Sequence, residues 1–200
     1  MNCEDKKRLA ELEMKLVLPS GFCESLLSED DWSFVIKLHA VFEAALSQLL
    51  SHHVGHPELQ EIFARLEISN SSTGKLAFAK ALGYLEDEER RIIRSWSELR
   101  NLLVHDVTNT SFDLKTHIAL LTAEQKKRFL SNFFMEEWFQ ADIRQEDGIA
   151  KATANPKEYL FLGAMSLLTQ LSNYFEWADY DRELAHHRWL EKVIKDFPSK

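Results

Sequence analysis

Turn-forming residues are scarce in this sequence. Its 200 residues include six glycines and four prolines, whereas all-β folds need many turns rich in glycine or proline. The scarcity therefore favours long helices joined by few connections. Hydrophobic and charged residues make up 45% and 28% of the chain, fractions typical of globular proteins, which excludes disorder throughout.

Cysteine and positive charge are also in short supply. Neither Cys3 nor Cys23 belongs to a Cys-x-x-Cys pair, so we expect no disulfide framework and no thiolate zinc site. The net charge of −8 argues against a broad basic surface for nucleic-acid phosphates. No uninterrupted apolar run approaches the ~20 residues that cross a bilayer, and the polar residues 2–8 do not form a signal peptide. We therefore expect a cytoplasmic protein without a membrane partner.

Apolar residues recur with helical spacing, and no strand pattern of useful length appears. The pattern predicts helices over approximately 4–17, 28–55, 57–66, 74–85, 86–105, 123–139, 156–175 and 184–193. Ser28 is the expected N-cap of the second helix, and the polar residues 140–155 are expected to form a loop or a local excursion. The fold class is thus predicted to be all-α, a single-domain helical bundle of six to eight helices, with residues 1-27 as an N-terminal helical extension.

Two groups of apolar residues are candidates for the core. Trp96 and Leu99 lie one turn apart on the expected buried stripe of their helix, so both should be buried. A dense aromatic group is expected to form core or a dimer interface; it comprises Phe129, Phe133, Phe134, Trp138 and Phe139.

Residues 100–105 hold the side chains best suited to chemistry. Arg100 offers a planar cation that clamps phosphate, and His105 can exchange a proton near neutral pH. Asn101 and His105 share a helix face, but Arg100 and His105 lie roughly 140° apart on an ideal helix. Arginine and histidine would converge only if the helix frays, or if two copies meet across a dimer axis. A solvated helix end whose cations suit the helix dipole is the alternative interpretation.

Residues 74–85, the acidic helix start after them and residues 99–106 together resemble the mannitol repressor family. More broadly they resemble the HEPN superfamily, which is marked by arginine, a polar residue, three further residues and histidine. Arg100, Asn101 and His105 match that motif residue by residue. Residues 39–46 are similar to the family's first core helix, in which Glu43 would be the acidic residue that faces the site. The similarity covers roughly residues 30 to 115.

The resemblance implies that residues 28-200 form a HEPN-like, mannitol-repressor-like domain, often dimeric through the motif region. It implies a non-enzymatic regulatory or protein-interaction module, active in transcription regulation as a homodimer with a further protein partner. The alternative is a metal-independent ribonuclease of the toxin or defence type, which would take RNA as substrate and use Arg100, Asn101, His105 and Glu43. The acidic composition, and the absence of an evident helix-turn-helix reader, favour the regulatory function.

No pattern predicts a metal or a cofactor. His52, His53 and His56 cluster near a helix end, but no cysteine or carboxylate close in sequence completes a metal site. The Glu-x-x-His unit at Glu183 and His186 has no second copy, which a di-iron bundle requires. The scattered glycines form no phosphate-binding loop.

Overall fold

The computed structural model describes residues 3–105, 110–143 and 147–196, and all regular secondary structure in these ranges is helical. The all-α prediction is therefore confirmed. The α-helices are α1 (Cys3–Lys15), α2 (Phe22–Ser25), α3 (Asp31–Val54), α4 (Gln60–Ala64), α5 (Lys75–Ala81), α6 (Asp87–Val104), α7 (Leu114–Ala119), α8 (Ala123–Ser131), α9 (Glu136–Trp138), α10 (Gly148–Ala154) and α11 (Pro156–Asp196). Short 3-10 helices η1 (Leu26–Ser28) and η2 (Pro57–Leu59) and the π-helical stretch η4 (Phe139–Ile143) complete them.

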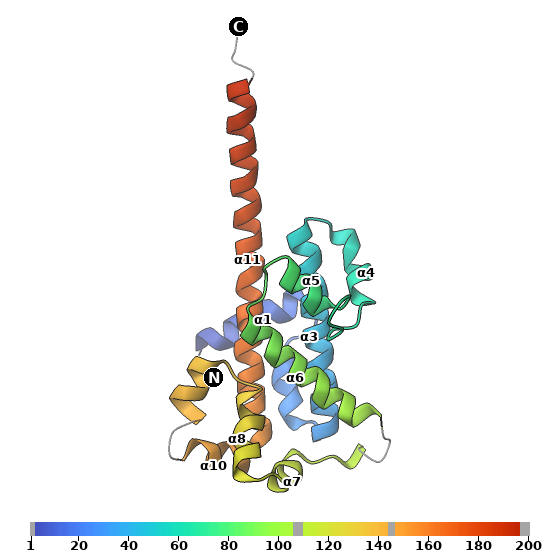
Figure 1. The fold of residues 1–200 in the computed structure, drawn as a ribbon, viewed down its shortest axis with the longest axis vertical. Helices are drawn as coiled ribbons and strands as arrows, with labels where there is room; N and C mark the ends of the chain where they lie inside the picture. The colour runs from blue at the N-terminus through green and yellow to red at the C-terminus, as the bar shows by residue number, and fades with distance from the viewer. Residues whose placement is uncertain (1–2, 106–109, 144–146, 197–200) are drawn as a thin grey trace.

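Helix α3 is the centre of the bundle. It packs against α6, α4, α5 and the first part of α11, while α1 crosses α11 (Figure 1). Helices α7, α8 and α10 gather at one end of the bundle, and α4 and α5 lie toward its opposite end, beside the point where α11 extends beyond it (Figure 1). The core between α3, α6 and α11 consists of large buried side chains, including Phe34, Leu38, Phe42, Leu46, Trp96, Leu99, Leu167 and Leu171. The predicted burial of Trp96 and Leu99 is thus confirmed.

Length and hydropathy alone would let α3 cross a membrane. Its 18-residue window has a mean hydropathy of 1.3, although the chain has no uninterrupted apolar run of that length. In the bundle, however, 61% of the window is buried against the other helices. A core helix of a soluble protein passes the same test, so this is weak evidence for a membrane span.

The N-cap of α3 is Asp30, and the prediction of Ser28 was wrong. The backbone N–H of Ser33 donates to Asp30 Oδ1 at 2.8 Å, and the Ser33 hydroxyl donates to Asp30 Oδ2 at 2.6 Å. Ser28 instead lies in η1, where its hydroxyl donates to the Ser25 carbonyl at 2.6 Å. Both residues are good caps, and the η1 turn moves the helix start two residues along the chain.

The single helix predicted over 123–139 is broken in the structure. Helix α8 ends at Ser131, and a turn then places both Phe133 and Phe134 in the core. This turn passes very close to α11: a Cβ on Gly163 would lie 2.6 Å from the Phe133 carbonyl oxygen. Of the polar segment 140–155, residues 148–154 form α10, whereas 144–146 lie outside the described residues.

The two C-terminal helices predicted over 156–175 and 184–193 are one helix. Helix α11 continues without interruption for 41 residues, because neither glycine nor proline interrupts the sequence between Gly163 and Pro198. The polar residues between the two predicted helices therefore mark the point where α11 leaves the bundle. Beyond that point the helix projects away from the rest of the molecule (Figure 1).

Candidate functional site

The buried carboxylate of Glu89 holds the N-terminal end of α6 in place through two hydrogen bonds. The Glu86 N–H, at the N-cap, donates to Glu89 Oε2 at 2.8 Å, and the Tyr174 hydroxyl of α11 donates to Glu89 Oε1 at 2.9 Å. Burial raises the pKa of Glu89, although both of these hydrogen bonds oppose the shift. The carboxylate joins the start of α6 to α11.

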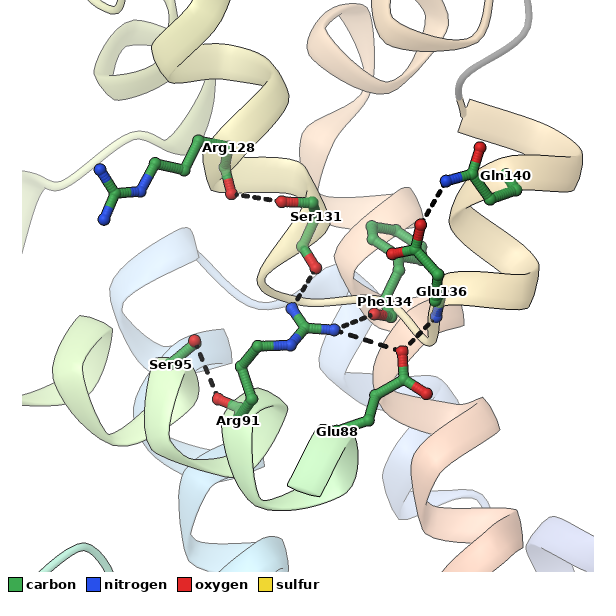
Figure 2. Close-up of polar contacts among 8 residues, drawn as sticks. All are labelled: Glu88, Arg91, Ser95, Arg128, Ser131, Phe134, Glu136 and Gln140. Carbon is green, nitrogen blue, oxygen red and sulfur yellow. Dashed lines mark hydrogen bonds and ion pairs between the residues drawn. The ribbon is translucent and has the colours of Figure 1, made fainter. Parts of the chain in front are cut away.

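Arg91 connects α6 to the turn after α8 (Figure 2). Its guanidinium donates to the carbonyl oxygens of Ser131 and, at 3.0 Å, of Phe134, and it lies 3.4 Å from Glu88 Oε1. The same Glu88 oxygen accepts the N–H of Glu136, at the start of α9. Each group in this arrangement is matched to a backbone or side-chain partner, so we interpret it as structural.

The motif residues lie at the other end of α6. Arg100 is half-buried and donates to Asn101 Oδ1 at 3.1 Å, whereas His105 is the exposed C-cap. The indole N–H of Trp32 donates to the Leu103 carbonyl at 3.4 Å, which supports the last turn of the helix. Within the described part of the chain, no hydrogen bond or ion pair joins Arg100 to His105. Because α6 does not fray before His105, a single copy leaves the two side chains apart.

Glu43 of α3 lies at a buried imidazole. Its side chain is 40% exposed, and its Oε2 is 3.9 Å from Nδ1 of His39, one turn earlier. Nε2 of His39 is 3.1 Å from the Ser97 hydroxyl of α6, which itself donates to the Ile93 carbonyl. Since the Ser97 proton is used in that bond, Ser97 accepts from His39, and Nδ1 of the neutral ring is left facing Glu43.

Lys75, the first residue of α5, places a cation beside Glu43 and His39. Its side chain is 1% exposed, and no hydrogen bond or ion pair joins its ammonium group to another described residue. Burial lowers the pKa of Lys75, and the charge of Glu43 opposes that shift. A Cβ on Gly74 would lie 2.5 Å from the Asn70 carbonyl oxygen. Glycine at this position therefore lets the loop of residues 67–74 fold tightly against the start of α5.

Lys75 and Arg100 lie near enough to influence His39 through their charges, and Glu43 contacts His39. We refer to His39, Glu43, Lys75 and Arg100 together as the ionic cluster. Burial lowers the pKa of His39, and the positive charges of Arg100 and Lys75 lower it further, while Glu43 opposes them. The cluster thus contains two cations, one carboxylate and a neutral imidazole. It has the chemistry to hold an anion and to accept a proton.

The structure brings Arg100 and Glu43 to the same cluster and places His105 outside it. The sequence prediction included Glu43 and Arg100 but gave no role to Lys75 or His39. The four-residue spacing of His39 and Glu43 on one helix face was an available signal. The burial of Lys75 could not be predicted in this way, because it depends on the tertiary packing of α5 against α3.

The three histidines near the end of α3 have separate partners. His52 lies 3.0 Å from Asp179 of α11, His53 stacks on Tyr84, and His56 pairs with Glu58 at 2.8 Å. Among the described residues, no group of three or more His, Cys, Asp or Glu side chains is arranged to hold a metal ion.

The projecting part of α11 carries large exposed side chains. The last contact with the bundle that we identify is the pair of His52 and Asp179. Trp177 and Trp189 are 59% and 58% exposed, and Tyr180 and Leu190 are exposed as well. In the aromatic group of residues 129–139, by comparison, Phe133, Phe134 and Phe139 are buried and only Trp138 is exposed.

No family model, curated protein or solved structure matches this chain. The resemblance to the mannitol repressor family and to the HEPN superfamily therefore stays a prediction.

Proposed function

We propose that this protein is a non-enzymatic regulatory module that acts by binding protein through the projecting end of α11. The observation that carries the proposal is the exposure of Trp177, Tyr180 and Trp189 on a helix segment that leaves the bundle. Tryptophan and tyrosine are the side chains that most often contribute large binding energies at protein interfaces. A partner that covered them would remove substantial apolar surface from water.

The lack of packing around the described side chains of the projecting α11 segment supports the same function. Most helix stability in proteins comes from the packing of an apolar face against other elements. The segment after Asp179 has its aromatic side chains in solvent. A bound partner would supply the packing that the bundle supplies to residues 156–175.

The cellular setting belongs to the proposal. Cys23 is a buried free thiol whose pKa is raised to about 12, mainly by burial. A buried free thiol forms no disulfide, so nothing about Cys23 requires an oxidising compartment. We place the protein in the cytoplasm as a homodimer in transcription regulation, in agreement with the resemblance of residues 74–106.

Photo-crosslinking in cells tests the proposal. A photoreactive phenylalanine analogue at Trp177 should give a discrete crosslinked protein band. The same analogue at Leu120, which is also exposed but lies on the bundle, should give none. Equal crosslinking at both positions, or no crosslinking at Trp177, would contradict the proposal.

Metal-independent RNA cleavage is the second candidate function, and the ionic cluster favours it. The half-buried Arg100 could contact a phosphodiester, the buried Lys75 adds positive potential behind it, and the neutral imidazole of His39 could accept a proton. The test is cleavage of single-stranded RNA in the presence of a chelator. Activity that is lost in the His39→Gln protein, with the fold unchanged by circular dichroism, would establish the ribonuclease function at the ionic cluster and displace the regulatory one, whereas loss only in the His105→Ala protein would assign the activity to the sequence motif.

A further inference from the structure

We infer that the partner of the projecting α11 segment is the same segment of a second copy of this chain, paired in antiparallel orientation about Leu184. The inference rests on the proposed function, since it names the partner of the same surface. It places the dimer contact on α11 and away from the Arg100–His105 motif.

The first evidence is a seam of side chains with coiled-coil spacing. Trp177, Tyr180, Leu184, His187 and Glu191 follow one another at intervals of three, four, three and four residues. That alternation is the spacing of the contact positions of paired helices; here the first three positions hold large aromatic or aliphatic side chains, and the last two hold histidine and glutamate. With ~100° per residue, the five positions fall within an arc of about 80°. Four of the five side chains are exposed, and Leu184 is half-buried on the helix surface.

The two tryptophans on opposite sides of the projecting α11 segment contact different residues. Trp189 lies roughly 160° from the middle of the seam, where its ring stacks on His186 at 6.0 Å. Trp177, by contrast, makes an edge contact with Tyr174 at 5.5 Å. Tyr174 itself packs against the core and donates to Glu89. The seam is therefore continuous with the bundle surface, and Trp189 is not part of it.

Charge selects the antiparallel orientation. In the sequence, residues 176–183 include four acidic residues and one arginine, while 185–192 include one lysine, one arginine, two histidines and one acidic residue. A parallel pair would set the acidic segment against its own copy, and like charges on paired helices are destabilising. An antiparallel pair about Leu184 sets the acidic segment against the more basic one.

The same register sets residue 184 − n of one chain opposite residue 184 + n of the other, so that Trp177 lies opposite Glu191. Leu184 meets its own copy on the two-fold axis, and Tyr180 lies opposite His187 and Arg188 of the second chain, where an arginine can stack on the phenol ring. Residues 177–191 span about 21 Å, which is a short contact. The residues after 191 would then lie beside the partner's bundle, near the point where its α11 emerges. We expect a dimer that forms at micromolar concentration.

Single cysteines test the orientation. In a Cys3→Ser background, with Cys23 buried, the Leu184→Cys protein should form a disulfide-linked dimer under mild oxidation. The Trp177→Cys and Glu191→Cys proteins should each stay unlinked alone and should form a mixed disulfide when combined. Self-linking of both end variants would establish a parallel pair and overturn the inference.

A matched pair of substitutions tests the seam. Trp177→Glu should raise the dissociation constant of the dimer by about tenfold or more, as measured by sedimentation equilibrium. Trp189→Glu makes the same chemical change at an equally exposed tryptophan and should change it by less than about threefold. Equal weakening by both substitutions would contradict the seam.

The outcomes also separate this inference from the proposed function. A wild-type protein that stays monomeric at about 100 µM, together with a crosslink from Trp177 to a different protein, would overturn the dimer, including the homodimer in the proposed function, and would leave the protein-binding role of α11 standing. A crosslink from Trp177 to a second copy supports both. The absence of dimer and crosslink alike would overturn both.

Discussion

The two ends of α6 each place an arginine in a polar cluster, and they differ in how the charges are matched. At the N-terminal end, Arg91 has two carbonyl oxygens and the Glu88 carboxylate as partners. At the C-terminal end, Lys75 lies buried beside Glu43 without an ion-pair partner among the described residues. A polar cluster that serves stability satisfies its donors internally, whereas a charge that is largely removed from water without an ion-pair partner is destabilised, as the lowered pKa of Lys75 indicates. The comparison indicates that the ionic cluster, rather than the Arg91 arrangement, is the one suited to bind an anion.

The largest effect is expected at Trp96, midway between the two clusters. Its buried ring contacts Phe34 and Phe42 with centroids 6.0 Å away and Phe133 at 5.0 Å. Trp96→Ala should lower the free energy of unfolding by about 3–5 kcal/mol, as measured by urea denaturation. The indole N–H has no hydrogen-bond partner among the residues that the structure describes, so Trp96→Phe should cost less. A loss below about 1 kcal/mol in the alanine variant would mean that the two ends of α6 do not share one core.

Arg91→Ala should have the next largest effect. It removes the guanidinium bonds to the Ser131 and Phe134 carbonyls and so should lower the free energy of unfolding by about 2 kcal/mol. Arg94→Ala, at an exposed position on the same helix, should change it by less than about 0.5 kcal/mol. Hydrogen exchange should locate the weakening at the turn after α8. Equal losses in the two variants would remove the structural role that we assign to Arg91.

Lys75→Met should behave in the opposite way. It replaces a buried cation by an apolar chain of similar length and leaves Glu43 in contact with solvent. The free energy of unfolding should stay unchanged or rise by about 1 kcal/mol, measured by the same denaturation. A loss of 2 kcal/mol or more, on the order of that expected at Arg91, would show that both clusters are structural and that the comparison fails.

The smallest effect is a pH dependence at His39. Burial and two nearby cations lower the pKa of its ring in the folded protein. The unfolded chain therefore binds the proton more readily, and stability is lost as pH falls from about 6.5 toward the lower pKa of the folded state. His39→Gln, which can still donate to Ser97, should flatten that part of the profile.

His117 gives the control for this profile. Burial lowers its pKa in the same direction, but it lies on α7, away from the ionic cluster. His117→Gln should remove a separate part of the pH dependence, and the two contributions should add. A profile that His39→Gln leaves unchanged would mean that its ring is not held neutral by the cluster.

Sequence periodicity was sufficient for the helices and for the inward face of α6, because an apolar stripe is a local property. It was insufficient at residue 131, where the end of α8 depends on the contact of the following turn with Gly163 of α11. Polar residues 176–183 were interpreted as a break between helices, although helix-compatible residues continue through them. The position of Lys75 depends equally on tertiary contacts. Arg100, Asn101 and His105 could be named from the sequence, and ideal helix geometry predicted that Arg100 and His105 lie apart. Only the structure shows that α6 stays helical up to His105 and so keeps them apart.

The length of α11 has a mechanical consequence. The segment after Trp177 extends for about 30 Å, and the same backbone continues into the core at Leu171 and Leu167. A lateral force at the tip therefore acts on the bundle through a lever arm, with a fulcrum where Asp179 meets His52 and the Lys15 ammonium lies over the Phe175 ring. Rotation of the tip turns the core-facing side chains of α11 with it. A force applied to the far end of α11 therefore strains the contacts between the core-facing side chains of α11 and α3.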